Sequence, residues 1–315
     1  MTQLFNACEY LLDRRLAAGD GPRLALTGTA GELTYAQLHD RVGRTATGLR
    51  AIGLQPEQRV LMLMADTPEF VTVYLAAMRI GAIPVPVSTM LRPDGVAELL
   101  IDSRARFLAV TREFSAVAAE AAAAAPELAA ILADHAVAGA PVPVHLLDSV
   151  QAGPFGENVY STTADSPAFW LYTSGTTGRP KAAMHRHGAV RVVGESYGTQ
   201  VLGIRPDDRC LSSAKAFFAY GLGNSVLFPL AAGAAGVLER ALSKPDVIAA
   251  VARDYGATLF FAGPTFFAGP LPALDQALRG RHHRRPGHDR DAAHLLVQPA
   301  RPGPGRHHRP GRPRL

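Results

Sequence analysis

The sequence predicts an α/β protein in which helices pack on layered parallel or mixed sheets. Short apolar runs alternate with stretches of helical spacing over most of its 315 residues, and this alternation is typical of parallel strands joined by helical connections. Hydrophobic residues make up 48% of the chain and charged residues 19%, which is the composition of a soluble globular protein. The length allows for about two domains.

Three helices are expected in the first quarter of the chain. Residues 6–18 carry apolar side chains at helical spacing. Thr34 and Gln37 fit a capping box, in which each side chain satisfies a backbone N–H, and the helix should stop at Gly53. Residues 67–69 start the third helix, with a proline in the first turn and a glutamate near the positive end of the dipole. The strands expected around these helices are residues 24–27, 60–64 and 83–87.

The middle of the chain continues the alternation, with a helix at residues 94–102 and a strand at residues 107–110. From about Ser115 an alanine-rich stretch predicts a long helical region that faces solvent and is interrupted by Pro126 and Pro141. The remaining expected elements are strands at residues 142–147, 168–171, 208–213 and 258–262, and helices at residues 185–201 and 243–256.

A loop rich in hydroxyls and glycines dominates the functional interpretation. It runs from Tyr172 to Lys181, follows the apolar strand 168–171, and precedes residues 182–185, where a helix could begin. Glycines let backbone N–H groups approach a polyphosphate, hydroxyls donate hydrogen bonds, and an ammonium group neutralises charge. The spacing differs from that of P-loop NTPases, and the alternative is a polar surface turn. The residues expected to hold phosphates are Thr173, Ser174, Gly175, Thr176, Thr177, Gly178 and Lys181.

This loop resembles the phosphate-binding signature of the adenylate-forming superfamily, which includes acyl-CoA synthetases, peptide-synthetase adenylation domains and luciferases. The resemblance covers residues 5–268, although Ala182 stands where the family often has glycine. It implies an enzyme that joins a carboxylic acid to ATP, releases pyrophosphate and passes the acyl group to a thiol. The cofactors and substrates implied are ATP, Mg²⁺, coenzyme A and a small carboxylic acid.

A second segment, Lys-Ala-Phe-Phe-Ala-Tyr-Gly-Leu-Gly-Asn from Lys215 onward, combines an aromatic wall with one hydroxyl and flexible glycines. On chemistry alone, core packing by Phe217 and Phe218 explains it equally well. The segment resembles the acid pocket of benzoate-type CoA ligases, which favours an aryl acid over a fatty acid. That resemblance assigns the pocket to Phe218, Ala219, Tyr220 and Gly221.

Several classes of protein and site are disfavoured. Cys8 and Cys210 provide neither a disulfide framework nor metal-ligand spacing, which suits the cytoplasm. No signal peptide is recognised, and the longest apolar stretch, residues 226–238, is too short to span a membrane. His185 and His187 lack further ligands, so a position at a helix start explains them better than a metal site. The oligomeric state is left open.

The last segment differs in character. Residues 281–315 hold nine arginines, six histidines, six prolines and four glycines against two aspartates, so this segment carries +7 of a chain whose net charge is +5. We expect residues 269–315 to be a disordered tail unrelated to the family. One interpretation is an electrostatic arm for nucleic acid. The other is a frameshift between Ala268 and Arg281 in a GC-rich gene, which sequencing across that junction would test.

The tail affects the expected activity, because the family uses a late acidic residue for Mg²⁺ and a lysine near its C-terminus. No glutamate follows Glu239 and no lysine follows Lys244. We therefore assign no catalytic residue and expect this chain to be an impaired or inactive part of an aryl acid–CoA ligase. The alternatives are a non-catalytic nucleotide- or acyl-binding remnant, a fatty-acyl-CoA ligase and, least favoured, a nucleic-acid binder.

Overall fold

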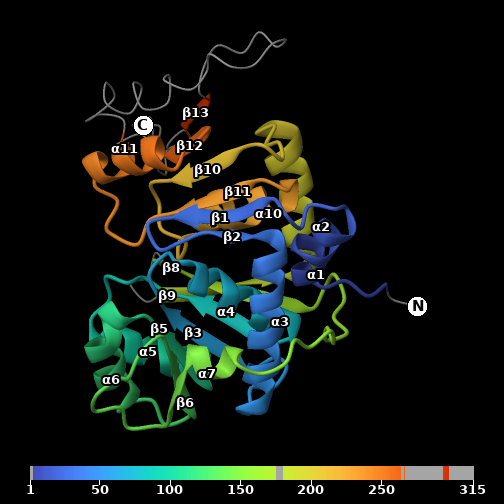
Figure 1. The fold of residues 1–315 in the computed structure, drawn as a ribbon. Helices are drawn as coiled ribbons and strands as arrows, with labels where there is room; N and C mark the ends of the chain where they lie inside the picture. The colour runs from blue at the N-terminus through green and yellow to red at the C-terminus, as the bar shows by residue number, and fades with distance from the viewer. Residues whose placement is uncertain (1–2, 175–179, 264–265, 267–293, 298–315) are drawn as a thin grey trace, which may run out of the picture.

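The computed structural model describes residues 3–174, 180–263, 266 and 294–297, and their fold contains three sheets (Figure 1). The six-stranded sheet has the order β13-β12-β10-β11-β1-β2. Its strands are parallel except for β2, which pairs antiparallel with β1. The strands are β1 (Leu24–Gly28), β2 (Leu33–Thr34), β10 (Arg209–Ser212), β11 (Ala235–Leu238), β12 (Leu259–Ala262) and β13 (His294–Val297).

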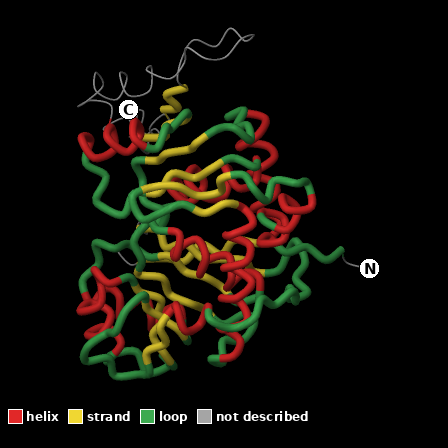
Figure 2. The backbone as a smooth tube through the Cα atoms, in the orientation of Figure 1, coloured by secondary structure: helices red, strands yellow, loops and turns green. Residues whose placement is uncertain are grey.

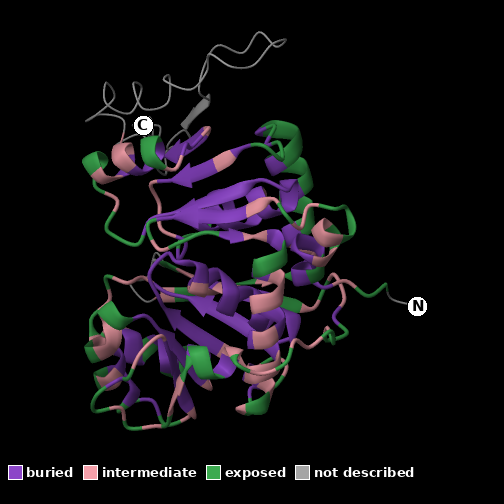
Figure 3. Cartoon of the chain, viewed as in Figure 1, coloured by how far each residue is buried: buried purple, intermediate pink, exposed green. Residues whose placement is uncertain are grey.

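The second sheet is five-stranded and parallel throughout, in the order β4-β3-β5-β6-β7. β3, β4, β5 and β6 are almost entirely buried, as expected of parallel strands covered on both faces (Figure 3). The strands are β3 (Arg59–Leu63), β4 (Ile83–Pro86), β5 (Phe107–Val110), β6 (Ala130–Ala133) and β7 (Val144–Leu146). A third sheet pairs β8 (Pro167–Ser174) with β9 (Pro180–Arg186), antiparallel.

Helices surround these sheets and connect their strands (Figure 2). The largest core cluster takes residues from the first helix, α3, α4, β1, β3 and α10, so it joins the two large sheets through the helices between them. The α-helices are α1 (Ala7–Leu11), α2 (Asp13–Ala17), α3 (Tyr35–Ala51), α4 (Pro68–Arg79), α5 (Pro93–Ser103), α6 (Ser115–Ala122), α7 (Leu147–Gln151), α8 (His187–Val193), α9 (Ala219–Leu222), α10 (Phe228–Ala232) and α11 (Pro245–Asp254). Arg112–Phe114 forms a 3₁₀ turn, and Gly194–Val201 and Gly223–Leu227 are π-helices.

The helix starts that were predicted from capping residues are confirmed for α3 and α4. The Thr34 hydroxyl accepts from the Gln37 amide and the Gln37 side chain accepts from the Thr34 N–H, which completes the capping box of α3. The Thr67 hydroxyl caps α4 by accepting from the Phe70 amide, with Pro68 at the first helical position. Gly53 follows α3 with φ of 99°, a left-handed conformation that glycine adopts without strain.

Two helical predictions were wrong in extent. Residues 6–18 form two short helices, α1 and α2, separated at Leu12. The alanine-rich region is helical only over α6 and then returns as strand β6, because the apolar run around Ile131 pairs with β5. The expectation that this region faces solvent was also wrong for α6, whose Ala118, Ala121 and Ala122 are buried against the five-stranded sheet.

The backbone of His294–Val297 forms β13 and pairs in parallel with β12. This strand contradicts the expectation of disorder at these four residues, three of which are the apolar Leu295, Leu296 and Val297. The other residues of the predicted tail lie outside the described ranges, so disorder there stays a prediction.

Candidate functional site

The predicted phosphate loop connects the two strands of a hairpin. β8 and β9 pair from Pro167 opposite Arg186 to Ser174 opposite Pro180, and they lie between the two large sheets (Figure 1). The expectation that a helix follows the loop was therefore wrong. Residues 182–185 form strand β9, and the helix begins only at His187.

The hairpin brings two predicted phosphate contacts together. Thr173 lies directly opposite Lys181 in the ladder. The Thr173 hydroxyl donates to the Lys181 carbonyl at 3.4 Å, and both residues are exposed. The backbone of Ser174 pairs with Pro180 at the end of the ladder. The other predicted contacts, Gly175, Thr176, Thr177 and Gly178, lie outside the described residues.

The base of the hairpin is anchored by aromatic side chains. Phe169 is buried, and its ring stacks on His185 of the opposite strand with centroids 4.5 Å apart. The Tyr172 hydroxyl donates to Asp102 of α5, and burial raises the pKa of this tyrosine above its ordinary value. β8 also packs against β4 of the five-stranded sheet. The end of the hairpin that carries Thr173 and Lys181 therefore extends from strands that are packed against the rest of the protein.

The predicted acid pocket begins at an exposed aromatic, Phe218, which directly follows a core residue, Phe217. Phe217 is 6% exposed and Phe218 46% exposed, with ring centroids 4.3 Å apart. Phe218 is the N-cap of α9, which places Ala219 on the surface. Core packing is therefore shown for Phe217 alone, whereas the ring of Phe218 is partly exposed to solvent.

Tyr220 and Gly221 form the inner part of this segment. The Tyr220 hydroxyl donates to the Ala262 carbonyl at 3.4 Å, and burial raises the pKa of the phenol to about 12, so it stays a neutral hydrogen-bonding group. Gly221 is buried against backbone, and a Cβ on it would overlap the carbonyl oxygens of Ala214 and Lys215. Glycine is required here by close approach.

Sequence analysis missed the charged groups that hold this segment. The Lys215 ammonium donates to the carbonyls of Glu239 and Ala241, and the buried Asp66 carboxylate accepts from the Ala216 amide. A sequence signal was available, because Lys215 is one of only three lysines and lies in an otherwise apolar run. Asp66 likewise lies three residues after a buried strand.

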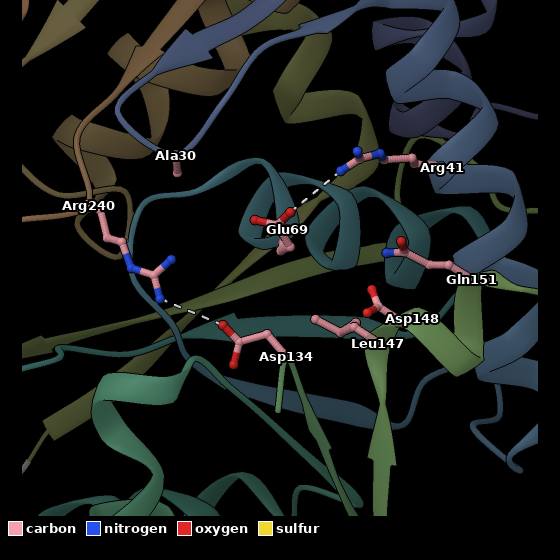
Figure 4. A pocket seen from close by; sticks show the side chains of 8 residues that line it. All are labelled: Ala30, Arg41, Glu69, Asp134, Leu147, Asp148, Gln151 and Arg240. Atoms are coloured by element: carbon pink, nitrogen blue, oxygen red, sulfur yellow. Dashed lines mark hydrogen bonds and ion pairs between the residues drawn. The ribbon is translucent and has the colours of Figure 1, made fainter. Parts of the chain in front are cut away.

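A polar cavity of about 370 Å³ lies elsewhere, between the two large sheets (Figure 4). Arg240 reaches Asp134 across it at 3.7 Å, and Arg41 faces Glu69 at 3.5 Å. It is lined by Ala30, Arg41, Glu69, Asp134, Leu147, Asp148, Gln151 and Arg240. None of these is a predicted site residue, and both arginines of the cavity pair with carboxylates that line it, so we assign no ligand to the cavity.

The described side chains at the open end of the hairpin offer few ligands for Mg²⁺. Thr173 and Lys181 supply a hydroxyl and an ammonium, neither of which is a carboxylate ligand of the kind Mg²⁺ prefers. Within the described ranges, no group of three or more histidine, cysteine, aspartate or glutamate side chains could hold a metal ion. The described residues thus do not fit a magnesium site of their own. None of the described helices is both long and apolar enough to cross a bilayer.

Comparison with known proteins identifies the class of protein to which this fold and hairpin belong. The AMP-binding enzyme family matches residues 14–296, and the chain belongs to this family. The matched range extends past residue 268.

Particular relatives are aryl-CoA ligases. The chain is 38% identical over 268 residues to a 4-hydroxybenzoate–CoA/benzoate–CoA ligase of Rhodopseudomonas palustris. This alignment covers 85% of this chain and 49% of the relative. It is 36% identical to a benzoate–CoA ligase of Thauera aromatica, with 86% and 51% covered. The chain spans about half the length of the curated relatives it matches.

Solved structures agree on the fold. A benzoate CoA ligase from Burkholderia xenovorans LB400 aligns with a TM-score of 0.77 and 31% identity, covering 86% of this chain and 53% of that one. The anthranilate CoA ligase AuaEII, in complex with anthranoyl-AMP, aligns with a TM-score of 0.80 and 27% identity, covering 85% and 51%.

Proposed function

We propose that this chain is the ATP- and acid-binding part of an aryl acid–CoA ligase of the benzoate class. The observation that carries the proposal is the segment from Phe218 to Gly221, which presents an exposed aromatic ring beside a half-buried phenol and a glycine that lets the backbone approach closely. The similarity to benzoate–CoA ligases at 36–38% identity supports the same class of acid.

The reaction of the whole enzyme would proceed in two steps. A carboxylate oxygen attacks the α-phosphorus of ATP, and the bond to the β-phosphate oxygen breaks, so pyrophosphate leaves with the electron pair. The sulfur of coenzyme A, having lost its proton, then attacks the acyl carbon, and AMP leaves as the thioester forms. Mg²⁺ bound to the ATP phosphates would neutralise part of their charge.

The residues of this chain would supply binding and orientation. The exposed Lys181 and Thr173 sit on opposite strands at the mouth of the hairpin, where an ammonium and a hydroxyl can both reach a phosphate oxygen. Together with the glycine-rich loop they would bind ATP. Phe218 and Tyr220 would bind the acid through ring contacts, at the distances common for aromatic pairs.

The proposal is tested with the full chain, ATP and Mg²⁺. We expect benzoate to bind in calorimetry and octanoate to bind much more weakly. We expect the Lys181→Met variant to lose at least about tenfold in ATP affinity, because a charge-assisted bond to phosphate is removed. The matched control is Lys244→Met, which removes an exposed lysine that precedes α11.

Release of pyrophosphate distinguishes an active ligase from a binding remnant. Benzoate-dependent pyrophosphate, followed by thioester on addition of coenzyme A, would show a working enzyme. Binding of ATP and benzoate without pyrophosphate would select the remnant. Preference for octanoate over benzoate would contradict the aryl assignment.

A further inference from the structure

Three charged side chains, one of them from the segment itself, hold the acid-pocket segment, which we define as residues 214–221. Asp66 and Glu239 are 6% and 5% exposed, and Lys215 is half-buried. The Lys215 ammonium lies against the carbonyls of Glu239 and Ala241, just after β11. Charges so placed are costly unless they are paired and hydrogen-bonded, so a specific use for them is expected.

Asp66 holds the segment from the opposite side. Both of its carboxylate oxygens lie 3.1 Å from the Ala216 amide nitrogen, which donates to them. Asp66 follows β3 of the five-stranded sheet, whereas Glu239 follows β11 of the six-stranded sheet. The start of the acid-pocket segment is therefore tied to both large sheets.

The tied residues control where the aromatic wall lies. The Lys215 carbonyl accepts from the Phe218 amide at 3.0 Å, and the same carbonyl packs on Gly221. The Phe218 carbonyl in turn accepts from the Leu222 amide at 2.8 Å, in the first turn of α9. A shift of the Lys215 backbone would move Phe218 and the turn that carries Tyr220.

We infer that Asp66 and Lys215 are positioning residues that set the acid-pocket segment for an aryl ring, an inference that rests on the proposed function. They act through the backbone at Ala216 and Lys215 and touch no reacting atom. Glu239 completes the group: its Oε1 accepts from the Ala241 amide at 2.6 Å, and its Oε2 has no hydrogen-bond partner among the described residues.

The charges of the group make this positioning depend on pH. Burial raises the pKa of Asp66 to about 6; the Lys215 ammonium and the Ala216 amide oppose this rise, and Glu239 adds to it. Burial lowers the pKa of Lys215, and Asp66 and Glu239 oppose that change. Protonation of Asp66 as the pH falls through about 6 removes the charge that faces Lys215 and weakens the acceptor for Ala216.

The first experiment measures benzoate and ATP binding to the full chain by calorimetry. Lys215→Met should weaken benzoate binding about tenfold, because carbonyls and carboxylates lose their buried cation, and it should leave ATP affinity unchanged. The control Lys244→Met removes the exposed lysine that precedes α11 and should change neither affinity. Hydrogen exchange of the amides of Phe218 and Leu222 should become faster in Lys215→Met without any ligand.

The second experiment uses Asp66→Asn, which keeps one carbonyl acceptor for Ala216 but cannot titrate. Wild-type affinity for benzoate should fall from about pH 7.5 to about pH 5.5, whereas the affinity of Asp66→Asn should stay level. This pH profile tests the positioning role even if Lys215→Met fails to fold. If Asp66 were merely structural, benzoate affinity would depend on pH in the same way in the wild type and in Asp66→Asn.

The outcomes separate the two proposals. No benzoate binding by the wild-type chain would contradict the proposed function. Benzoate binding that is equally tight in wild type and folded Lys215→Met, or parallel pH profiles for wild type and Asp66→Asn, would overturn the positioning role alone.

Discussion

His187 shows how burial alone can explain a histidine that invites a metal hypothesis. It is fully buried as the first residue of α8, and its Nδ1 accepts from the Ala7 amide at 3.0 Å. That bond ties the first helix to α8. His185, two residues earlier, stacks on Phe169. The predicted position at a helix start is confirmed for His187, but nothing in the pattern indicated its partner in α1.

We predict that His187 makes the fold sensitive to acid. Burial lowers the pKa of its imidazole from 6.5 to about 4. Between these values the unfolded chain binds a proton that the native chain does not, so native stability falls as the pH drops through 6.5. The loss should approach about 2–3 kcal/mol near pH 4. His187→Asn keeps an acceptor for Ala7 and should flatten the profile; urea unfolding at several pH values measures it.

Gly221 lies too close to neighbouring backbone to accept a side chain. A methyl group there would overlap the carbonyls of Ala214 and Lys215, so Gly221→Ala should lower the free energy of unfolding by about 1–3 kcal/mol. Gly153→Ala is the control, because a Cβ there meets nothing within 4 Å. Thermal unfolding of both variants gives the comparison. Equal stability would show that the backbone at Gly221 relaxes freely.

The β8–β9 hairpin was not predicted from the sequence, because a helix was expected where β9 forms. β8 was predicted from its aromatic, apolar run. β9 carries two alanines and no β-branched residue, so its local preference does not favour a strand. Pairing with β8 along seven positions decides its conformation. Tertiary contacts of this kind are invisible to a local pattern, whereas capped helices such as α3 and α4 were predictable because their signals are local.

The capping box of α3 offers an element-level prediction. Thr34→Ala should reduce the free energy of unfolding by about 1 kcal/mol, the usual effect of losing an N-cap side chain. Because Thr34 and Gln37 cap each other's backbone, the double variant with Gln37→Ala should lose less than the sum of the two single losses. A double-mutant cycle in urea measures this coupling, and strict additivity would contradict a reciprocal box.

At the scale of the whole molecule, one arginine bridges the two large sheets. Arg240 follows β11, donates to Glu113 after β5 and lies 3.7 Å from Asp134 after β6. These groups are partly exposed, so Arg240→Gln should cost less than about 1 kcal/mol, and the cost should shrink in high salt. The control is Arg253→Gln, whose exposed ion pair is with its sequence neighbour, Asp254. Urea unfolding at low and high salt tests both variants.

The α/β class and the family were predictable because both depend on short-range signals: alternating elements, and the contiguous loop from Tyr172 to Lys181. The network around Lys215 was not, since its partners Asp66 and Glu239 are 149 and 24 positions away and meet it only through the packing of two sheets. The position of β1 between β11 and β2 in the six-stranded sheet could not be predicted either, because the local sequence pattern of a strand does not indicate its neighbours in a sheet.

The place of β1 has a consequence for the order in which the chain folds during synthesis. β1 pairs with β11, and Leu26 lies opposite Gly236 in this pairing. The contact between β1 and β11 therefore cannot form until Gly236 has been synthesised. The five-stranded sheet needs only residues 59–146, a continuous stretch with shorter loops to close. On the ribosome this sheet can assemble first, while β1 emerges early and can pair only with β2 until more than two hundred further residues have been made and β11 is available.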